Sequence, residues 1–213
     1  RRRPRLATTA QGILGWSLPF LEGSIEPALV ELLRNADVLT TEPEGLLRAR
    51  VRVSTLHGQF FLHSAYPTTA EDAVFLGPDS YRFADLIRSE LLNAPLKSGS
   101  VVVDIGTGAG VGAVVAADLS PGARMIMTDL NVQALALAQT NARHAGHTVE
   151  ARRGRDLAGF ADPIDLAFAN PPYIIDPDGR AYRDGGGNLG AEISIAMSRA
   201  ALSGLGREGG FNL

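Results

Sequence analysis

The residues with the clearest chemical potential follow a short apolar stretch, where residues 165–179 read DLAFANPPYIIDPDG. The strand ends on Asn170, Pro171, Pro172 and Tyr173. Prolines have no N–H, and a residue before proline is held extended, so this turn is stiff. The Asn170 side-chain oxygen and the Pro171 carbonyl oxygen are then outward acceptors, and Tyr173 adds a flat aromatic face. This set suits a planar –NH2 group, whose nitrogen it would aim at an electrophile; the alternative is a turn without function.

A glycine-rich turn follows another apolar stretch, where residues 104–110 read DIGTGAG. Gly106, Gly108 and Gly110 let the backbone approach a ligand where a Cβ would clash, and the following helix begins with free N–H groups. The G-x-G-x-x-G pattern of dinucleotide-binding turns is incomplete, because position 111 is Val. The turn therefore predicts a ligand site; the alternative is a tight connection between strand and helix.

An acidic residue, Asp129, ends the next strand and supports the ligand reading. An acid at this place can accept hydrogen bonds from both hydroxyls of a ribose. The alternative is a helix N-cap, since Leu130 and Asn131 open the next helix. The chain has no G-x-x-x-x-G-K-[ST] loop, which argues against hydrolysis of a nucleoside triphosphate.

The elements that carry these residues alternate between strand and helix patterns. We expect strands at 101–105, 123–129, 148–152, 164–169 and from 211, and helices at 109–119, 131–146 and 189–203. This alternation predicts a doubly wound parallel α/β sheet with right-handed crossovers. In such a sheet the first and fourth strands are neighbours, so the ends of all three motifs face one crevice.

A different pattern precedes this region and predicts a small α+β domain over residues 1–67, with the sheet domain at 68–213. A helix begins near Ser24, which we expect to cap it. Residues 46–53 and 59–66 predict a hairpin that turns at His57-Gly58. Its arginines (Arg48, Arg50 and Arg52) fall on one strand face, either as a basic stripe for RNA or an acidic partner or as a solvated surface.

The composition of the chain argues against a membrane-spanning protein and against cysteine-based chemistry. The chain has 213 residues, 45% hydrophobic and 20% charged, with a net charge of -3, as expected of a soluble globular protein. It has no cysteine, which fits a cytoplasmic location, and no apolar run reaches the roughly 20 residues of a membrane helix. We expect no metal site and no membrane partner. Since it lacks an initial Met and ends at Leu213, we expect a fragment or missing terminal residues.

Taken in order, DIGTGAG, Asp129 and NPPY resemble the class I S-adenosylmethionine-dependent methyltransferases that act on nitrogen. Protein-glutamine N5-methyltransferases of release factors carry NPPY, as do N6-adenine methyltransferases of DNA and RNA. The resemblance covers about 68–213 and implies a Rossmann-like methyltransferase sheet whose carboxy-terminal strands are missing here. It also implies S-adenosyl-L-methionine as the cofactor.

The resemblance also implies roles for individual residues. Methyl transfer would involve Asn170, Pro171 and Tyr173, and the acceptor would contact these and Pro172. An acid near the adenine amino group is implied at Asp156. The cofactor set is Asp104, Gly106, Thr107, Gly108, Gly110, Asp129, Leu130, Asp156, Leu157 and Asn170.

Within the superfamily, the chain is most like the release-factor glutamine enzymes. VFLGPDS (74–80) and RDGGGNLG (183–190) are similar to their segments. Gly77 and Tyr81 stand where that family usually has an Arg and an acid, and the hairpin replaces its helical bundle. We therefore expect an N-methyltransferase with a macromolecular partner, a protein glutamine being favoured. Alternatives are an N6-adenine enzyme acting on rRNA, tRNA or DNA, and a non-catalytic cofactor- or RNA-binding module; Val111 and NPPY argue against an NAD-dependent oxidoreductase.

Overall fold

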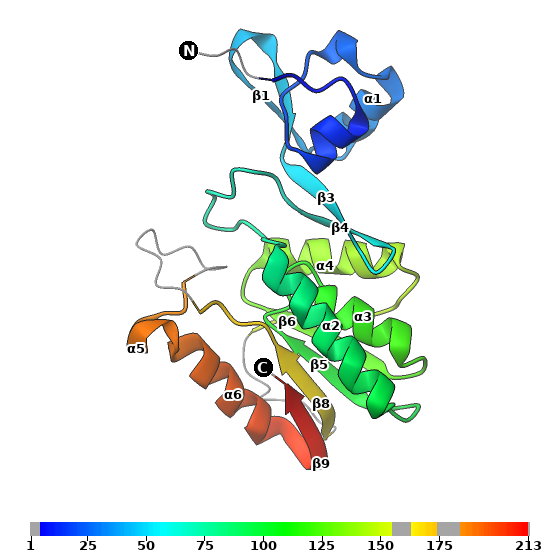
Figure 1. The fold of residues 1–213 in the computed structure, drawn as a ribbon, viewed down its shortest axis with the longest axis vertical. Helices are drawn as coiled ribbons and strands as arrows, with labels where there is room; N and C mark the ends of the chain where they lie inside the picture. The colour runs from blue at the N-terminus through cyan, green and yellow to red at the C-terminus, as the bar shows by residue number, and fades with distance from the viewer. Residues whose placement is uncertain (1–4, 155–162, 174–183, 213) are drawn as a thin grey trace. The chain divides into compact units, whose positions relative to one another are not determined.

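The computed structural model describes residues 5–154, 163–173 and 184–212. The chain divides into two compact units, Arg1–Thr69 and Ala70–Leu213 (Figure 1). Within the described ranges, no helix has the length and apolar character needed to cross a membrane.

The first unit builds a small core from short elements. A core of Ile13, Phe20, Val30 and Leu33 is buried between them. The strands form two antiparallel pairs, β1 (Leu39–Thr41) with β2 (Leu47–Ala49), and β3 (Val51–Leu56) with β4 (Gln59–Ser64). The helical elements are η1 (Gln11–Gly15), η2 (Glu22–Ser24), α1 (Pro27–Asn35) and η3 (Pro43–Gly45).

The predicted hairpin is confirmed at its turn and wrong in its first strand. His57 and Gly58 have φ values of 48° and 83°, as a two-residue turn requires. Residues 46–53 are not one strand, however, because β2 pairs with β1 and only β3 pairs with β4. Arg50 lies between the two strands, where its N–H donates to the Val38 carbonyl at 2.7 Å.

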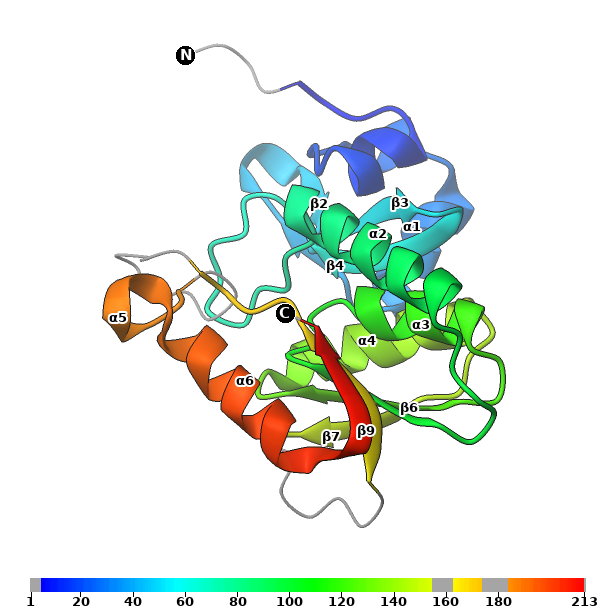
Figure 2. The ribbon, with the colours of Figure 1, turned by 60° about the horizontal axis from the view of Figure 1, so that its bottom comes forward.

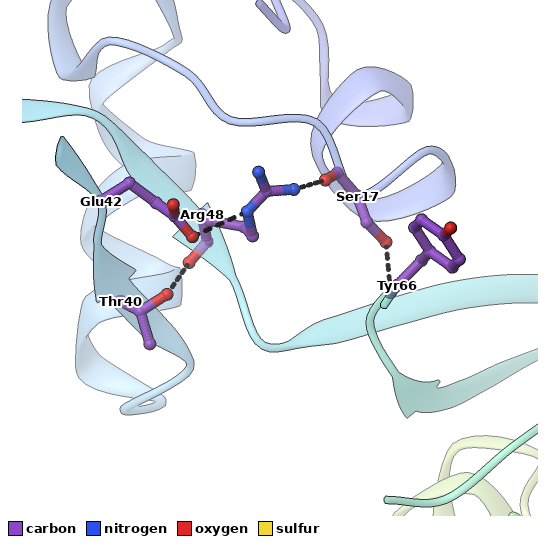
Figure 3. A network of polar contacts seen from close by, with 5 residues as sticks. All are labelled: Ser17, Thr40, Glu42, Arg48 and Tyr66. Atoms are coloured by element: carbon purple, nitrogen blue, oxygen red, sulfur yellow. Dashed lines mark hydrogen bonds and ion pairs between the residues drawn. The ribbon is translucent and has the colours of Figure 1, made fainter. Parts of the chain in front are cut away.

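The predicted arginine face is broken up by the same change. Arg48 Nε lies 2.9 Å from the Glu42 carboxylate, and its guanidinium also donates to the Ser17 carbonyl oxygen (Figure 3). Arg50 pairs with Asp37 at 3.3 Å. Arg48 and Arg50 therefore make contacts inside their own unit, which takes two of the three arginines out of the expected basic stripe.

Ser24 does not cap the first helix, contrary to expectation. Its hydroxyl donates to the Leu21 carbonyl at 2.7 Å within the short η2 turn. Pro27 opens α1; before it Ile25 is extended, and Glu26 has a ψ of 126°, which is not helical. A residue before proline is disfavoured in helical geometry, so the helix begins later than the sequence suggested.

The second unit contains the doubly wound sheet that the sequence predicted. Its parallel strands have the order β7-β6-β5-β8-β9, so the chain proceeds outward from β5 in both directions. The strands are β5 (Val101–Ile105), β6 (Arg124–Asp129), β7 (Glu150–Arg153), β8 (Ile164–Ala169) and β9 (Leu205–Asn212). The helices are α2 (Pro78–Asn93), α3 (Val111–Leu119), α4 (Val132–His144), α5 (Gly187–Gly190) and α6 (Glu192–Gly204).

Helices lie on both faces of the sheet (Figure 2), and buried side chains of the strands pack against them. Val101, Val103 and Ile105 of β5 form one core with Met197 and Ala201 of α6. On the opposite face, Met127 of β6 packs with Ala113 of α3 and Ala138 of α4. Helices α2, α3 and α4 cover that face. Because β5 is buried on both sides, it reads as a continuous apolar run in the sequence.

Replacing Gly110 with Ala is expected to destabilise the second unit. Gly110 has a φ of 81°, and a Cβ there would lie 2.9 Å from the Ala138 Cβ and 3.0 Å from its Cα. The left-handed backbone costs about 1 kcal/mol, and the forced separation of α3 from α4 about 1–3 kcal/mol more.

Gly146→Ala is the matched control, since Gly146 has a φ of 84° and open space around its Cα. Urea unfolding should show a larger loss for Gly110→Ala. Equal losses would contradict the steric contact.

Candidate active site

A cavity of about 290 Å³ opens at the carboxyl ends of the central strands. The turn after β5, the end of β6 and the segment after β8 all contribute to its wall. Parallel strands end at the same edge of a sheet, so motifs that are distant in sequence meet here. Of the predicted site residues, the wall contains Asp104, Gly106, Thr107, Gly108, Asp129, Leu130, Asn170 and Pro172.

Other predicted site residues do not line this cavity. Gly110 lies behind the turn, against Ala138, and Pro171 is buried. Tyr173 is 60% exposed beyond the cavity. Asp156 and Leu157 lie outside the described residues. The structure therefore brings together the centre of each motif, and Gly110 packs behind the glycine turn.

The glycine turn has the backbone that its sequence demanded. Gly106, Gly108 and Gly110 have φ values of 68°, 55° and 81°, which favour glycine strongly. Thr107 N–H donates to the Thr128 carbonyl at 2.9 Å, which ties the turn to the end of β6. From α4, the buried Asn141 amide donates to the Ala109 carbonyl at 2.8 Å. The turn is thus fixed from both neighbouring elements.

Asp104 is the buried anchor of the turn. Its Oδ2 accepts from the Thr107 hydroxyl at 2.7 Å and from the Ala113 N–H at 3.0 Å. The pKa of this carboxyl is raised from 3.8 to about 7, mainly by burial and in small part by the Asp129 charge, while both hydrogen bonds oppose the shift. The carboxylate joins the end of β5 to the first turn of α3.

Asp129 faces the same cavity from the end of β6. Its Oδ2 accepts from the Gly108 N–H at 3.0 Å and its Oδ1 from the Asn131 N–H at 2.9 Å. The N-cap of α4 is Asn131, whose side chain accepts from Gln133 N–H, so Asp129 is not needed as the cap. Burial raises the pKa of Asp129 while these backbone N–H groups lower it.

The charge of the cavity wall distinguishes between a dinucleotide and S-adenosylmethionine as the cofactor. Carboxyl groups of Asp79, Asp104, Asp129 and Asp184 line the cavity, and its described wall residues include no Lys, Arg or His. Such a wall repels a pyrophosphate and attracts a cation. The dinucleotide alternative therefore has no electrostatic support.

Sequence reasoning missed part of this wall. Phe75, Asp79, Ser80 and Phe83 come from α2 and the segment before it, and Met197 comes from α6. The segment 74–80 stood out in the sequence only for its resemblance, although its acid, Asp79, stands in the first turn of α2, where the helix dipole stabilises an anionic side chain.

The structure offers a steric reason for Gly77, which stands where the release-factor glutamine enzymes usually have an Arg. A Cβ at Gly77 would lie 2.3 Å and 2.4 Å from ring atoms of Phe75. The Phe75 ring thus occupies the space that a side chain at position 77 would need.

Residues 84–181 match the family model of the methyltransferase small domain. This region is an S-adenosylmethionine-dependent methyltransferase domain. Over 185 residues, 82% of this chain and 64% of the relative, it is 32% identical to a release factor glutamine methyltransferase of Bordetella pertussis. Over 83 residues, 39% of this chain and 30% of the relative, it is 41% identical to the enzyme of that name in Deinococcus radiodurans. The chain thus spans less than two thirds of the length of these relatives.

A solved structure confirms the fold of the methyltransferase domain. A 16S rRNA N2 G1207 methyltransferase of T. thermophilus superposes with a TM-score of 0.56 and 16% identity, over 91% of this chain and 54% of that one. At this identity the likeness concerns the fold, which is the Rossmann-like sheet expected from the sequence.

S-adenosylmethionine is the cofactor of this domain, and the wall residues fit it. Its sulfonium and ammonium groups are cations, and the cavity is lined by carboxylates. A side chain at Gly106 would meet Met197 Cε at 2.8 Å, so the backbone itself forms this part of the cradle. The second lone pairs of the Asp129 oxygens remain as acceptors for a ribose diol.

Asp104→Asn is expected to flatten the pH dependence of the methyltransferase domain's stability. A carboxyl whose folded-state pKa is raised binds more protons when folded than when unfolded, so stability falls as pH rises between about 4 and 7. The variant lacks this titration. Its free energy of unfolding should gain a few kcal/mol relative to the wild type across that window, measured by urea unfolding at each pH. Parallel curves would show that Asp104 does not titrate as described.

Proposed function

We propose that the chain is the catalytic part of an N-methyltransferase that modifies the side-chain amide of a glutamine in a protein of the release factor class. The observation that carries the proposal is that Asn170 and Pro172 line the same cavity as Asp129 and the glycine turn. An acceptor nitrogen held at the end of β8 therefore lies beside the cofactor site. The names of the relatives support glutamine as the acceptor, and a cytoplasmic location is part of the proposal.

The end of β8 can hold such an amide by two hydrogen bonds. The Asn170 side-chain oxygen and the Pro171 carbonyl oxygen each accept one N–H of the planar group. Amide nitrogen is a poor nucleophile because its lone pair is delocalised. Two acceptors on its hydrogens favour pyramidal geometry and stabilise the positive charge that develops during transfer.

When bound, S-adenosylmethionine supplies a methyl group that the sulfonium has already activated. The residues of the chain align the acceptor nitrogen with that methyl group, which is the main requirement of an in-line displacement. The proton can leave the nitrogen after transfer, so no strong base is needed beforehand. This agrees with a described wall that offers carboxylates and no histidine.

The charge of the wall also supports a protein acceptor over a nucleic acid. A glutamine side chain is neutral, whereas an adenine arrives on a phosphate backbone that the carboxylates repel. In the first unit, Arg48 and Arg50 are paired with Glu42 and Asp37, and so offer little to phosphates.

Parallel transfer of a tritiated methyl group to release factor, rRNA, tRNA and DNA tests the substrate. We expect label in the release factor alone, recovered as methylated glutamine after digestion. Label in an RNA or in DNA would replace the proposal by the adenine alternative. Cofactor binding without transfer to any of them would support the non-catalytic alternative.

Asn170→Ala should lower the transfer rate by about 100-fold or more, because it removes an acceptor that acts in the transition state. Cofactor affinity measured by calorimetry should stay near that of the wild type. The control is Asn93→Ala, an exposed position at the end of α2. Near-normal turnover of Asn170→Ala would contradict the role of Asn170 in holding the acceptor nitrogen.

Asp129→Ala should weaken S-adenosylmethionine binding by about 10- to 100-fold, since hydrogen bonds to a charged group are lost. Asp129→Asn keeps one acceptor oxygen, so its affinity for S-adenosylmethionine should lie between those of the wild type and Asp129→Ala. Calorimetry gives the affinities, and thermal unfolding checks that the turn is intact. Unchanged affinity in a folded Asp129→Ala variant would remove Asp129 from the cofactor site.

A further inference from the structure

An acid from α2 contacts the residue that we propose to hold the acceptor. Asn170 Nδ2 donates to Asp79 Oδ2 at 3.4 Å, across 91 positions of sequence. Both residues line the cavity. We infer that Asp79 is a positioning residue, which fixes the orientation of the Asn170 amide so that its oxygen is presented to the acceptor nitrogen. The inference rests on the proposed function of Asn170.

The chemistry of the pair allows only one orientation of the amide. A carboxylate is an acceptor and has no proton to donate, whereas an Asn amide has a donor end and an acceptor end. The donor end must therefore face Asp79, and the oxygen is directed elsewhere. The reversed amide would place its oxygen against the carboxylate and its NH2 against the NH2 of the acceptor, so both contacts would be repulsive.

The elements that carry the pair are fixed to each other close to the contact. Phe83 lies one helical turn after Asp79, and Phe168 lies in β8 just before Asn170. Their rings meet edge to face, with centroids 5.9 Å apart and an interplanar angle of 71°. Such an aromatic contact contributes about 0.5–1.5 kcal/mol beyond burial in comparable pairs. It holds the first turn of α2 over the end of β8.

The first turn of α2 fixes the position of Asp79. Pro78 opens the helix and Asp79 is the acid in its first turn, where the helix dipole stabilises an anion. The buried Ser80 hydroxyl accepts from the Gly77 N–H at 3.3 Å, which fixes the backbone on either side of Asp79. The carboxylate is thus held in place before any substrate arrives.

Two substitutions at position 79 separate positioning from a proton-transfer role. Asp79→Ala should lower kcat by about 10- to 100-fold, because the acceptor is misaligned. Asp79→Asn removes the same charge, so any change in cofactor affinity should be equal in the two variants. Asp79→Asn should recover most of the rate, since its amide oxygen can still accept from Asn170. If Asp79 were a general base, Asp79→Asn would be as inactive as Asp79→Ala, and the inference would be overturned. Glu90→Ala on the same helix is the control.

A measurement without turnover tests the contact itself. The side-chain amide protons of Asn170, assigned by their disappearance in Asn170→Ala, should shift upfield in the NMR spectrum of Asp79→Ala and stay close to the wild type in Asp79→Asn. An unchanged position in Asp79→Ala would overturn the inference, whatever the acceptor is. If the shift occurs but no methyl transfer is found with the wild type, the contact stands and the proposed function fails.

Discussion

The site depends on a carboxylate buried at the end of the central strand. Asp104 accepts hydrogen bonds from Thr107 in the glycine turn and from Ala113 in the first turn of α3, and both partners are buried. Burying a carboxyl is unfavourable, and a pKa raised to about 7 is the sign of that cost. In return, the hydrogen bonds of Asp104 hold the glycine turn in its left-handed backbone conformation. Gly108 can then donate to Asp129, and Ala109 can accept from Asn141.

The strand order explains why one rigid turn suffices to organise the cavity. The first strand of the sheet, β5, lies between β6 and β8, with Asp104 level with Met127 on one side and with Phe168 on the other. Asp129 and Asn170 both follow these positions, each at the end of its own strand. The chain therefore needs no long loops to bring a ribose-binding acid and an amide-binding turn to opposite sides of the same turn.

Much of this could be predicted from the sequence, because strands buried on both faces leave continuous apolar runs and the motifs stand at their ends. Asp79 could not, because its partner lies 91 positions away and the contact depends on α2 packing against β8 through Phe83 and Phe168. The errors in the first unit have a local cause. Alternation in LLRARVRV (46–53) predicted one strand, but the chain bends at Arg50 between β2 and β3, so each half pairs with a different partner.

The charge distribution relates the cavity to the kind of acceptor it can use. Carboxylates line the wall, and they are distributed over α2, β5, β6 and the segment before α5. A cationic cofactor offsets part of this charge when it binds, and transfer of its methyl group moves the positive charge toward the acceptor nitrogen. The described wall has no Lys, Arg or His that would oppose this developing charge. A wall of this kind therefore suits an acceptor that is neutral before the reaction, such as a carboxamide, and opposes one that brings phosphates with it.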